Sequence, residues 1–251
     1  MIHLSAKTIY VPIAALVLLT GSCANDNEPI ATDPNAIAFQ TSVQTRAVKE
    51  SFGQGDSFTV WGGYDNDATN VFDDETVTYN GTNWSYSGGT RYWVSGKTYD
   101  FYAVYPTGVG SCDANGTITV TDFNSTDTDL MTAEVLSGEE STPGTVLFTF
   151  RHELARVQVV AQCEAGVTLN SASLNDVSTQ GTLTRTSSTN AEWSGLSSNT
   201  LTDNSGSQIA GTYNLFERDL LLIPQTPTTL SVNITRSSGT PISETFDLTD
   251  Y

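Results

Sequence analysis

The sequence contains few of the residues that build catalytic and metal sites. Its 251 residues include only two histidines and three cysteines. Because His3 lies in an N-terminal leader, a Ser-His-Asp or Cys-His site would have to use His152, and no nucleophile-elbow motif surrounds it. One histidine cannot form a multi-histidine zinc site. We therefore expect no cofactor, no metal and no enzymatic activity, and we assign His152 a structural role at a domain junction.

Basic residues are also scarce. The chain has 10 lysines and arginines against 28 aspartates and glutamates, which gives a formal net charge of −18. Such a surface repels phosphate backbones and anionic lipids, so we expect no nucleic acid partner. Hydrophobic residues make up 38% of the chain and aromatic residues 10%, which is enough for a packed core. A catalytic pair of carboxylates stays open as an alternative, because the fold rather than the sequence sets its spacing.

Long apolar runs are missing except near the N-terminus. Residues 9–19 follow Lys7 and are too few to span a bilayer, which is typical of a secretory leader. The run from Leu19 to Cys23, Leu-Thr-Gly-Ser-Cys, resembles a bacterial lipobox. We predict a lipoprotein signal peptide over residues 1–22, with Cys23 as the acylated new N-terminus that carries fatty acids such as palmitate. The alternative is an ordinary secretory leader in which Cys23 has no role.

Two further cysteines follow, Cys112 in a glycine-rich loop and Cys163 near the end of an apolar strand pattern. In an oxidising compartment the two thiols would be free to pair. Their unrelated settings favour two free thiols instead.

The chain lacks any sustained apolar stripe with a helical period, and short strands separated by turn residues are predicted throughout. A polar tether and an N-terminal strand occupy residues 23–46. An all-β fold follows, with two antiparallel β-sandwich domains over residues 47–153 and 154–251. The predicted strands are residues 57–62, 71–79, 84–86, 99–105, 117–121, 146–150, 155–161, 181–185, 220–223, 230–235 and 245–248.

Two local features are candidate ligand sites. Residues 65–70, Asp-Asn-Asp-Ala-Thr-Asn, begin like a calcium loop but lack the sixth-position glycine and flanking helices, so a solvated loop is favoured. Trp84, Tyr86, Tyr92 and Trp93 form a candidate platform for stacking on sugar rings. Aromatic residues in strands are more often part of the core, which is the competing interpretation of these four.

Arg46 marks a candidate processing site. No basic residue lies between Cys23 and Arg46, so an Arg-specific protease would first cut the mature chain between Arg46 and Ala47. Ile37, Phe39, Thr41 and Val43 alternate as in a strand just before this bond. Cutting would free that strand and leave an apolar groove for a strand of another molecule. The competing interpretation is an ordinary exposed arginine.

Several segments, taken in order, resemble the fimbrillin family, whose members are fimbrial lipoproteins of Gram-negative anaerobes from gut and mouth. The resemblance covers nearly all of the chain beyond the leader. The segments that carry it are Thr45-Arg46-Ala47, Gly55-Asp56, Trp93-Val94-Ser95-Gly96, Tyr99-Asp100-Phe101-Tyr102-Ala103-Val104-Tyr105-Pro106, Asp129-Leu130-Met131, Phe148-Thr149-Phe150-Arg151-His152-Glu153-Leu154-Ala155-Arg156-Val157 and Leu222-Ile223-Pro224-Gln225.

The resemblance implies two transthyretin-like β-sandwich domains and export to the cell outer membrane as a surface-exposed lipoprotein. It also implies cleavage after an N-terminal arginine, which by position is Arg46, and assembly into a fimbrium by donor-strand exchange. Expected partners are other fimbrial subunits, the outer membrane through the lipid, and host or bacterial surface receptors. The chain stops at Tyr251, one predicted strand after Thr235, so we expect a truncated second domain. The alternative function is a monomeric surface lipoprotein that binds glycans.

Overall fold

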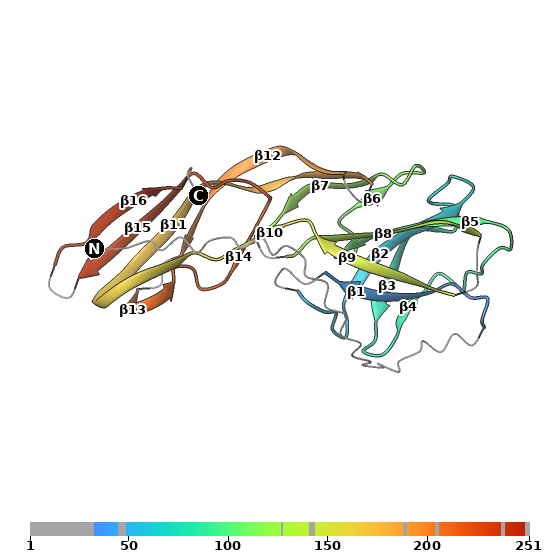
Figure 1. The fold of residues 1–251 in the computed structure, drawn as a ribbon, viewed down its shortest axis with the longest axis horizontal. Coiled ribbons are helices and arrows are strands. Elements are labelled where there is room, and N and C mark those ends of the chain that lie inside the picture. Colours follow the sequence, from blue (N-terminus) through green and yellow to red (C-terminus); the bar gives the residue numbers. More distant parts are fainter. Residues whose placement is uncertain are drawn as a thin grey trace, which may run out of the picture.

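The computed structural model describes residues 33–44, 49–126, 128–140, 144–187, 190–203, 206–236 and 239–248. Every regular element in these ranges is a β-strand, which confirms the all-β prediction. The strands build an elongated molecule with an N-terminal unit at one end and a second unit at the other (Figure 1). Within the described part of the chain, no helix is long and apolar enough to cross a membrane.

The N-terminal unit is made of seven strands joined in the order β1-β9-β8-β5-β2-β3-β4. Strands β8 and β9 share only the pairs Met131–His152 and Thr132–Arg151, and beyond these the sheet folds over on itself. β1 and β9 therefore cover the remaining strands as a second layer. The bounds are β1 (Ala38–Val43), β2 (Ser57–Tyr64), β3 (Phe72–Tyr79), β4 (Trp84–Tyr86), β5 (Thr98–Tyr105), β8 (Met131–Glu140) and β9 (Thr145–His152).

The local sequence explains these strands. In β9 the apolar residues Val146, Phe148 and Phe150 are buried, whereas the residues between them are exposed, as the period of a strand requires. The turn between β3 and β4 begins with Asn80-Gly81, a pair of residues that is common in hairpin turns. There the Asn80 side chain accepts hydrogen bonds from the backbone N–H groups of Thr82 and Asn83, both at 2.8 Å. Gly81 supplies the positive φ of 97° that this turn needs.

The second unit is organised around the very long strand β11 (Val160–Ser187). Its first part pairs with β13 and β15, and its last part pairs with β12 and β7. The other strands are β6 (Ser111–Cys112), β7 (Ile118–Asn124), β10 (Ala155–Val157), β12 (Asn190–Asp203), β13 (Ser207–Asn214), β14 (Leu220–Leu222), β15 (Thr229–Arg236) and β16 (Ile242–Asp247).

Strand pairing crosses residue 153, where the sequence placed the boundary between the two domains. β7 precedes that residue, yet it pairs antiparallel with the end of β11. The predicted strand at 155–161 is divided, because β10 pairs with β14 and β11 starts afresh at Val160. A hydrophobic cluster joins the two units at this junction. It contains Trp61, Ala68, Tyr102, Val104, Ile118, Val120, Phe123, Leu130, Leu154, Leu183, Leu221 and Ile223.

A buried ion pair also crosses the junction. Arg185 of β11 donates from Nη1 to Oε1 of Glu153 at 2.9 Å, and the two side chains are 5% and 6% exposed. Thr132 Oγ1 of β8 donates to the same oxygen. Because burying one charge without its partner is costly, loss of either charged group should destabilise this junction.

We predict that Arg185→Met lowers the free energy of unfolding by about 3–5 kcal/mol, because Glu153 loses its buried partner. The control is Arg156→Met, because Arg156 pairs with Asp219 while 42% of its own side chain is exposed. That change should cost at most about 1 kcal/mol. Urea unfolding followed by tryptophan fluorescence measures both, and equal losses would contradict the assigned role of the buried pair.

Candidate functional site

The candidate site is the groove that β1 fills in the N-terminal unit. β1 lies parallel to β9, in register from Ala38–Thr145 to Val43–Phe150. No direction was predicted for the pairing of this N-terminal strand. Gln44 continues it by donating its backbone N–H to the carbonyl of Phe150 at 2.8 Å. Just before β1, the backbone N–H of Ile37 donates to the carbonyl of Arg91 at 2.9 Å, so this end of the segment is bound to a part of the chain other than β9.

Phe39 is the side chain by which β1 enters the core. It is 1% exposed, and the neighbouring Ile37 is 2% exposed. The Phe39 ring stacks on Phe148 at a centroid distance of 5.7 Å. It also makes edge contacts with rings from β2, β3, β4 and β5, namely Phe58, Phe72, Tyr86 and Phe101. Removing β1 would therefore open a well lined by aromatic rings.

The aromatic residues suggested as a sugar platform lie around this strand. Trp84 donates from Nε1 to Thr41 Oγ1 at 3.1 Å, and Tyr86 donates its hydroxyl to the carbonyl of Ile37 at 2.9 Å. Trp93 donates from Nε1 to the carbonyl of Gly144 at 3.1 Å. All three rings pack against the core, whereas Tyr92 is 50% exposed. Two of the four side chains thus bind β1 directly.

A surface groove of about 580 Å³ runs beside β1. Its walls include residues 40–43 of β1, residues 50–52, and the side chains of Trp84 and Leu147. Leu147 points outward from β9 and is 54% exposed. One flank of β1 is therefore reachable from solvent along most of its length.

His152 is the last residue of β9 and lies near the end of β1. Its Nδ1 is 2.7 Å from Oδ2 of Asp129, and its Nε2 is 3.1 Å from the carbonyl oxygen of Gln44. An aspartate thus orients the ring as it would in a catalytic triad, but the second nitrogen faces a backbone carbonyl rather than a nucleophile. Burial raises the pKa of Asp129, and His152 partly offsets that rise. Cys23, Arg46 and Ala47 lie outside the described residues.

The other candidate features lie apart from β1. Cys112 and Cys163 are both free thiols, and burial raises the pKa of Cys112 to about 12. In the loop at residues 65–70, Asp67 Oδ1 accepts hydrogen bonds from the backbone N–H and hydroxyl of Thr69. Asp65 there pairs with Lys97. Among the described residues, no group of three metal-ligating side chains occurs.

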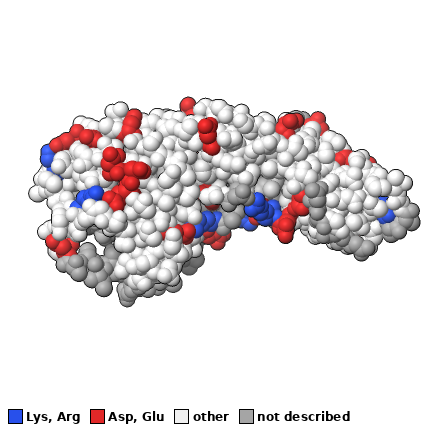
Figure 2. Space-filling view, turned by 180° about the vertical axis from the view of Figure 1, so that it is seen from behind, with Lys and Arg blue, Asp and Glu red and all other residues white. Residues whose placement is uncertain are grey.

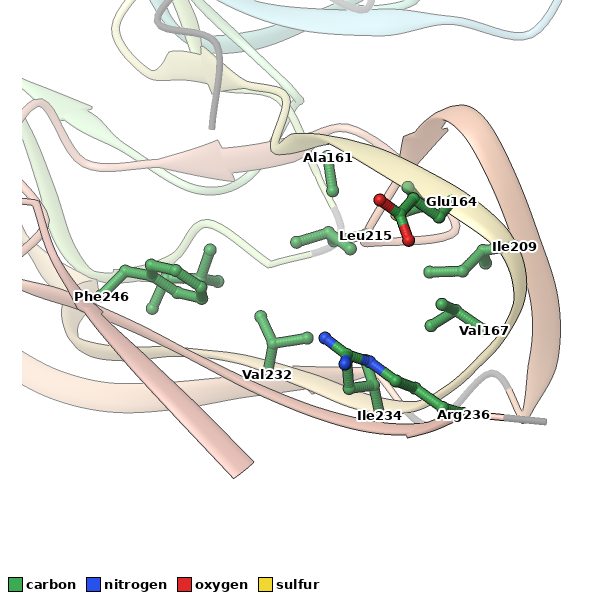
Figure 3. Close-up of a pocket in the computed structure, with 11 residues that line it drawn as sticks. Ala161, Glu164, Val167, Ile209, Leu215, Val232, Ile234, Arg236 and Phe246 are labelled. Atoms are coloured by element: carbon green, nitrogen blue, oxygen red, sulfur yellow. The ribbon is translucent and has the colours of Figure 1, made fainter. Parts of the chain in front are cut away.

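The second unit contains a narrow apolar slit (Figure 3). Its volume is about 20 Å³, which is close to the space that a single buried water needs. Glu164 and Arg236 are its charged members, and Val232 and Phe246 contribute to its apolar wall. Acidic side chains are scattered over the molecular face shown in Figure 2, and basic ones are few there.

Known proteins share this fold. A family model described as fimbrillin-like matches residues 45–249. A fimbrial protein from Bacteroides vulgatus superposes with a TM-score of 0.52 at 17% identity, over 85% of this chain and 88% of that one. A candidate cell adhesion protein from Bacteroides ovatus gives 0.54 at 16% identity, over 84% and 85%. Another from Bacteroides uniformis gives 0.50 at 19% identity, over 87% of each chain. At these identities the structures share the fold alone. No curated protein matches the chain.

We predict that Phe39→Ala lowers the free energy of unfolding by about 3–5 kcal/mol, since it leaves an aromatic-lined cavity. Gln40→Ala is the matched control, because Gln40 is the next residue of β1 and is exposed. Its effect should stay within about 0.5 kcal/mol. Urea denaturation of both variants measures the difference, and a Phe39 variant as stable as the control would show that β1 does not close the core.

Proposed function

The chain belongs to the fimbrillin-like family, and from this premise we propose that it is a fimbrial subunit that assembles by donor-strand exchange. In this proposal the chain is cut after Arg46, β1 leaves its place beside β9, and a strand from a neighbouring subunit takes that place. The role is structural and adhesive rather than enzymatic.

The observation that carries the proposal is the position of β1. It is an edge strand that pairs with β9 alone in its sheet, yet it supplies the buried Phe39. An incoming strand would regain the same main-chain hydrogen bonds, and pockets for alternate side chains would select it. The bond after Arg46 lies close behind β1 in the sequence, so a single cut would separate β1 from the rest of the unit.

Exchange also has a physical driving force. A groove emptied of β1 would expose Phe58, Phe72, Phe101 and Phe148, each at most 1% exposed while Phe39 covers them. Burying such rings contributes several kcal/mol, so the emptied groove favours any strand that restores their contacts. The incoming strand is expected to carry a large apolar residue opposite Phe148.

The N-terminal segment is the basis for a proposal about where this assembly takes place. We propose that Cys23 is acylated with palmitate-type chains and holds the uncut protein in the cell outer membrane, facing outward. Cutting after Arg46 would detach the subunit from that lipid. Its partners are then other fimbrial subunits and surface receptors of host or bacterial cells.

Glycan binding stays the second candidate function, and Tyr92 is the observation that favours it. Of the four aromatic residues in that hypothesis, Tyr92 alone is mostly exposed, and Val94 beside it is 42% exposed. Trp84 and Tyr86 are occupied with β1. A monomeric glycan-binding lipoprotein therefore has less support than a subunit that exchanges β1.

We predict that Arg46→Ala abolishes assembly in the native host, because β1 then stays attached. Sheared surface material from cells with the unchanged chain should give a high-mass ladder that collapses to one band on boiling in detergent. N-terminal sequencing of that band should begin at Ala47. The control is Arg218→Ala, which replaces an exposed arginine of the second unit and should leave the ladder intact. A ladder that persists in the Arg46 variant would overturn the proposal.

A further inference from the structure

The pair formed by Asp129 and His152 holds the end of β1. His152 is the last residue of β9, and Asp129 lies just before β8. Both side chains are 6% exposed. Nε2 of the histidine reaches the carbonyl oxygen of Gln44 at 3.1 Å, immediately beyond β1. On the other side of the processing bond, the backbone N–H of Lys49 favours the carboxylate form of Asp129.

The contacts of His152 and Asp129 determine how many protons the two side chains must carry together. A backbone carbonyl can only accept a hydrogen bond, so Nε2 must carry a proton to bind Gln44. The 2.7 Å contact between Nδ1 and Asp129 Oδ2 needs a second proton, on either atom. With one proton fewer, the histidine keeps N–H at Nδ1 for the carboxylate, and the lone pair of Nε2 faces the carbonyl. The contact with Gln44 is then lost.

The neighbouring charges are already paired with one another. Arg151 bonds to Glu134 at 3.1 Å, and Glu153 bonds to Arg185. The ammonium group of Lys49 lies 2.7 Å from Asp56. Asp129 Oδ1 has no hydrogen-bond partner among the described residues. The protons that matter for Gln44 are therefore the two shared by Asp129 and His152.

We propose that Asp129 and His152 act as a proton-dependent clamp on β1, which retains the strand while the pair holds two protons and loosens it when one leaves. They are positioning residues for strand exchange, so this inference rests on the proposed function. The clamp would keep a cut β1 seated while the pair holds both protons. A rise in pH would ease its departure and admit the incoming strand.

The sign of the pH effect follows from proton linkage. Because the contact with Gln44 needs the second proton, holding Gln44 favours the form of the pair that carries both protons. The released form does not need that proton, so loss of a proton favours release of Gln44. Retention of β1 should therefore fall as the pH rises through the range in which the pair loses one of its two protons.

Hydrogen exchange in the uncut chain tests the clamp directly. The amide of Gln44 donates to Phe150, so its protection reports how often the end of β1 opens. We expect its protection factor to fall about tenfold between pH 6 and pH 8.5, the size of effect that losing one hydrogen bond produces. Amides of β5 serve as the internal reference and should keep their protection factors. An unchanged protection factor for Gln44 would overturn the clamp.

Two variants separate the clamp from general stability. Asp129→Asn keeps both contacts without a titrating carboxyl, because its amide can donate to Nδ1 while Nε2–H donates to Gln44. In that variant we expect the Gln44 amide to be strongly protected from hydrogen exchange at both pH values. His152→Phe cannot donate, so it should show weak protection at both pH values. The same pH response in the unchanged chain and both variants would contradict the clamp role of Asp129 and His152. The protection of the β5 amides shows whether each variant is folded.

The uncut chain also keeps this test apart from the proposed function. If the chain shows the pH response at Gln44 but never forms a ladder in its host, the clamp is supported and the proposal of strand exchange is contradicted. If the chain assembles but the protection of Gln44 does not change with pH, only the clamp is contradicted.

Discussion

The N-terminal unit depends on one constraint, which is that its aromatic core must be covered by a strand held at the edge of a sheet. Phe39 satisfies it by contacting rings from five other strands. Because β1 pairs only with β9 among the described strands, the stability of the core is tied to a strand at the edge of the sheet. Trp84, Tyr86 and His152 each bind β1, and together they compensate for its position at the edge.

Much of the N-terminal unit could be predicted from the sequence, because its strands alternate apolar and polar residues. β9 follows that rule, whereas β5 is recognised as an aromatic run ended by Pro106, and the Asn80-Gly81 turn carries its own signal. The second unit was harder to predict. β12 is mostly exposed, and its large apolar residues Trp193, Leu196 and Leu201 do not alternate, so the strand pattern gives no sign of it. The length of β11 also escaped prediction, since its bulges interrupt the pattern and different partners cover its two parts.

The candidate site could be predicted only along β1. Alternation of Ile37, Phe39 and Thr41 indicates a strand, and the scarcity of basic residues points to Arg46. The contacts of β1 depend on residues far away in the sequence, and no local pattern reveals them. Asp129 is one example, because nothing near it indicates His152 as its partner. The parallel pairing with β9 is another, because sequence-distant strands meet only in the folded chain.

The most direct test of the account is a cryo-electron microscopy map of filaments purified from the native host. The account predicts that the strand beside β9, in register with Val146, Phe148 and Phe150, is continuous with a neighbouring subunit. A large apolar side chain of that strand should occupy the well that Phe39 fills in the uncut chain. A map in which β1 of the same chain still lies beside β9, joined to Lys49 through Arg46, would contradict it.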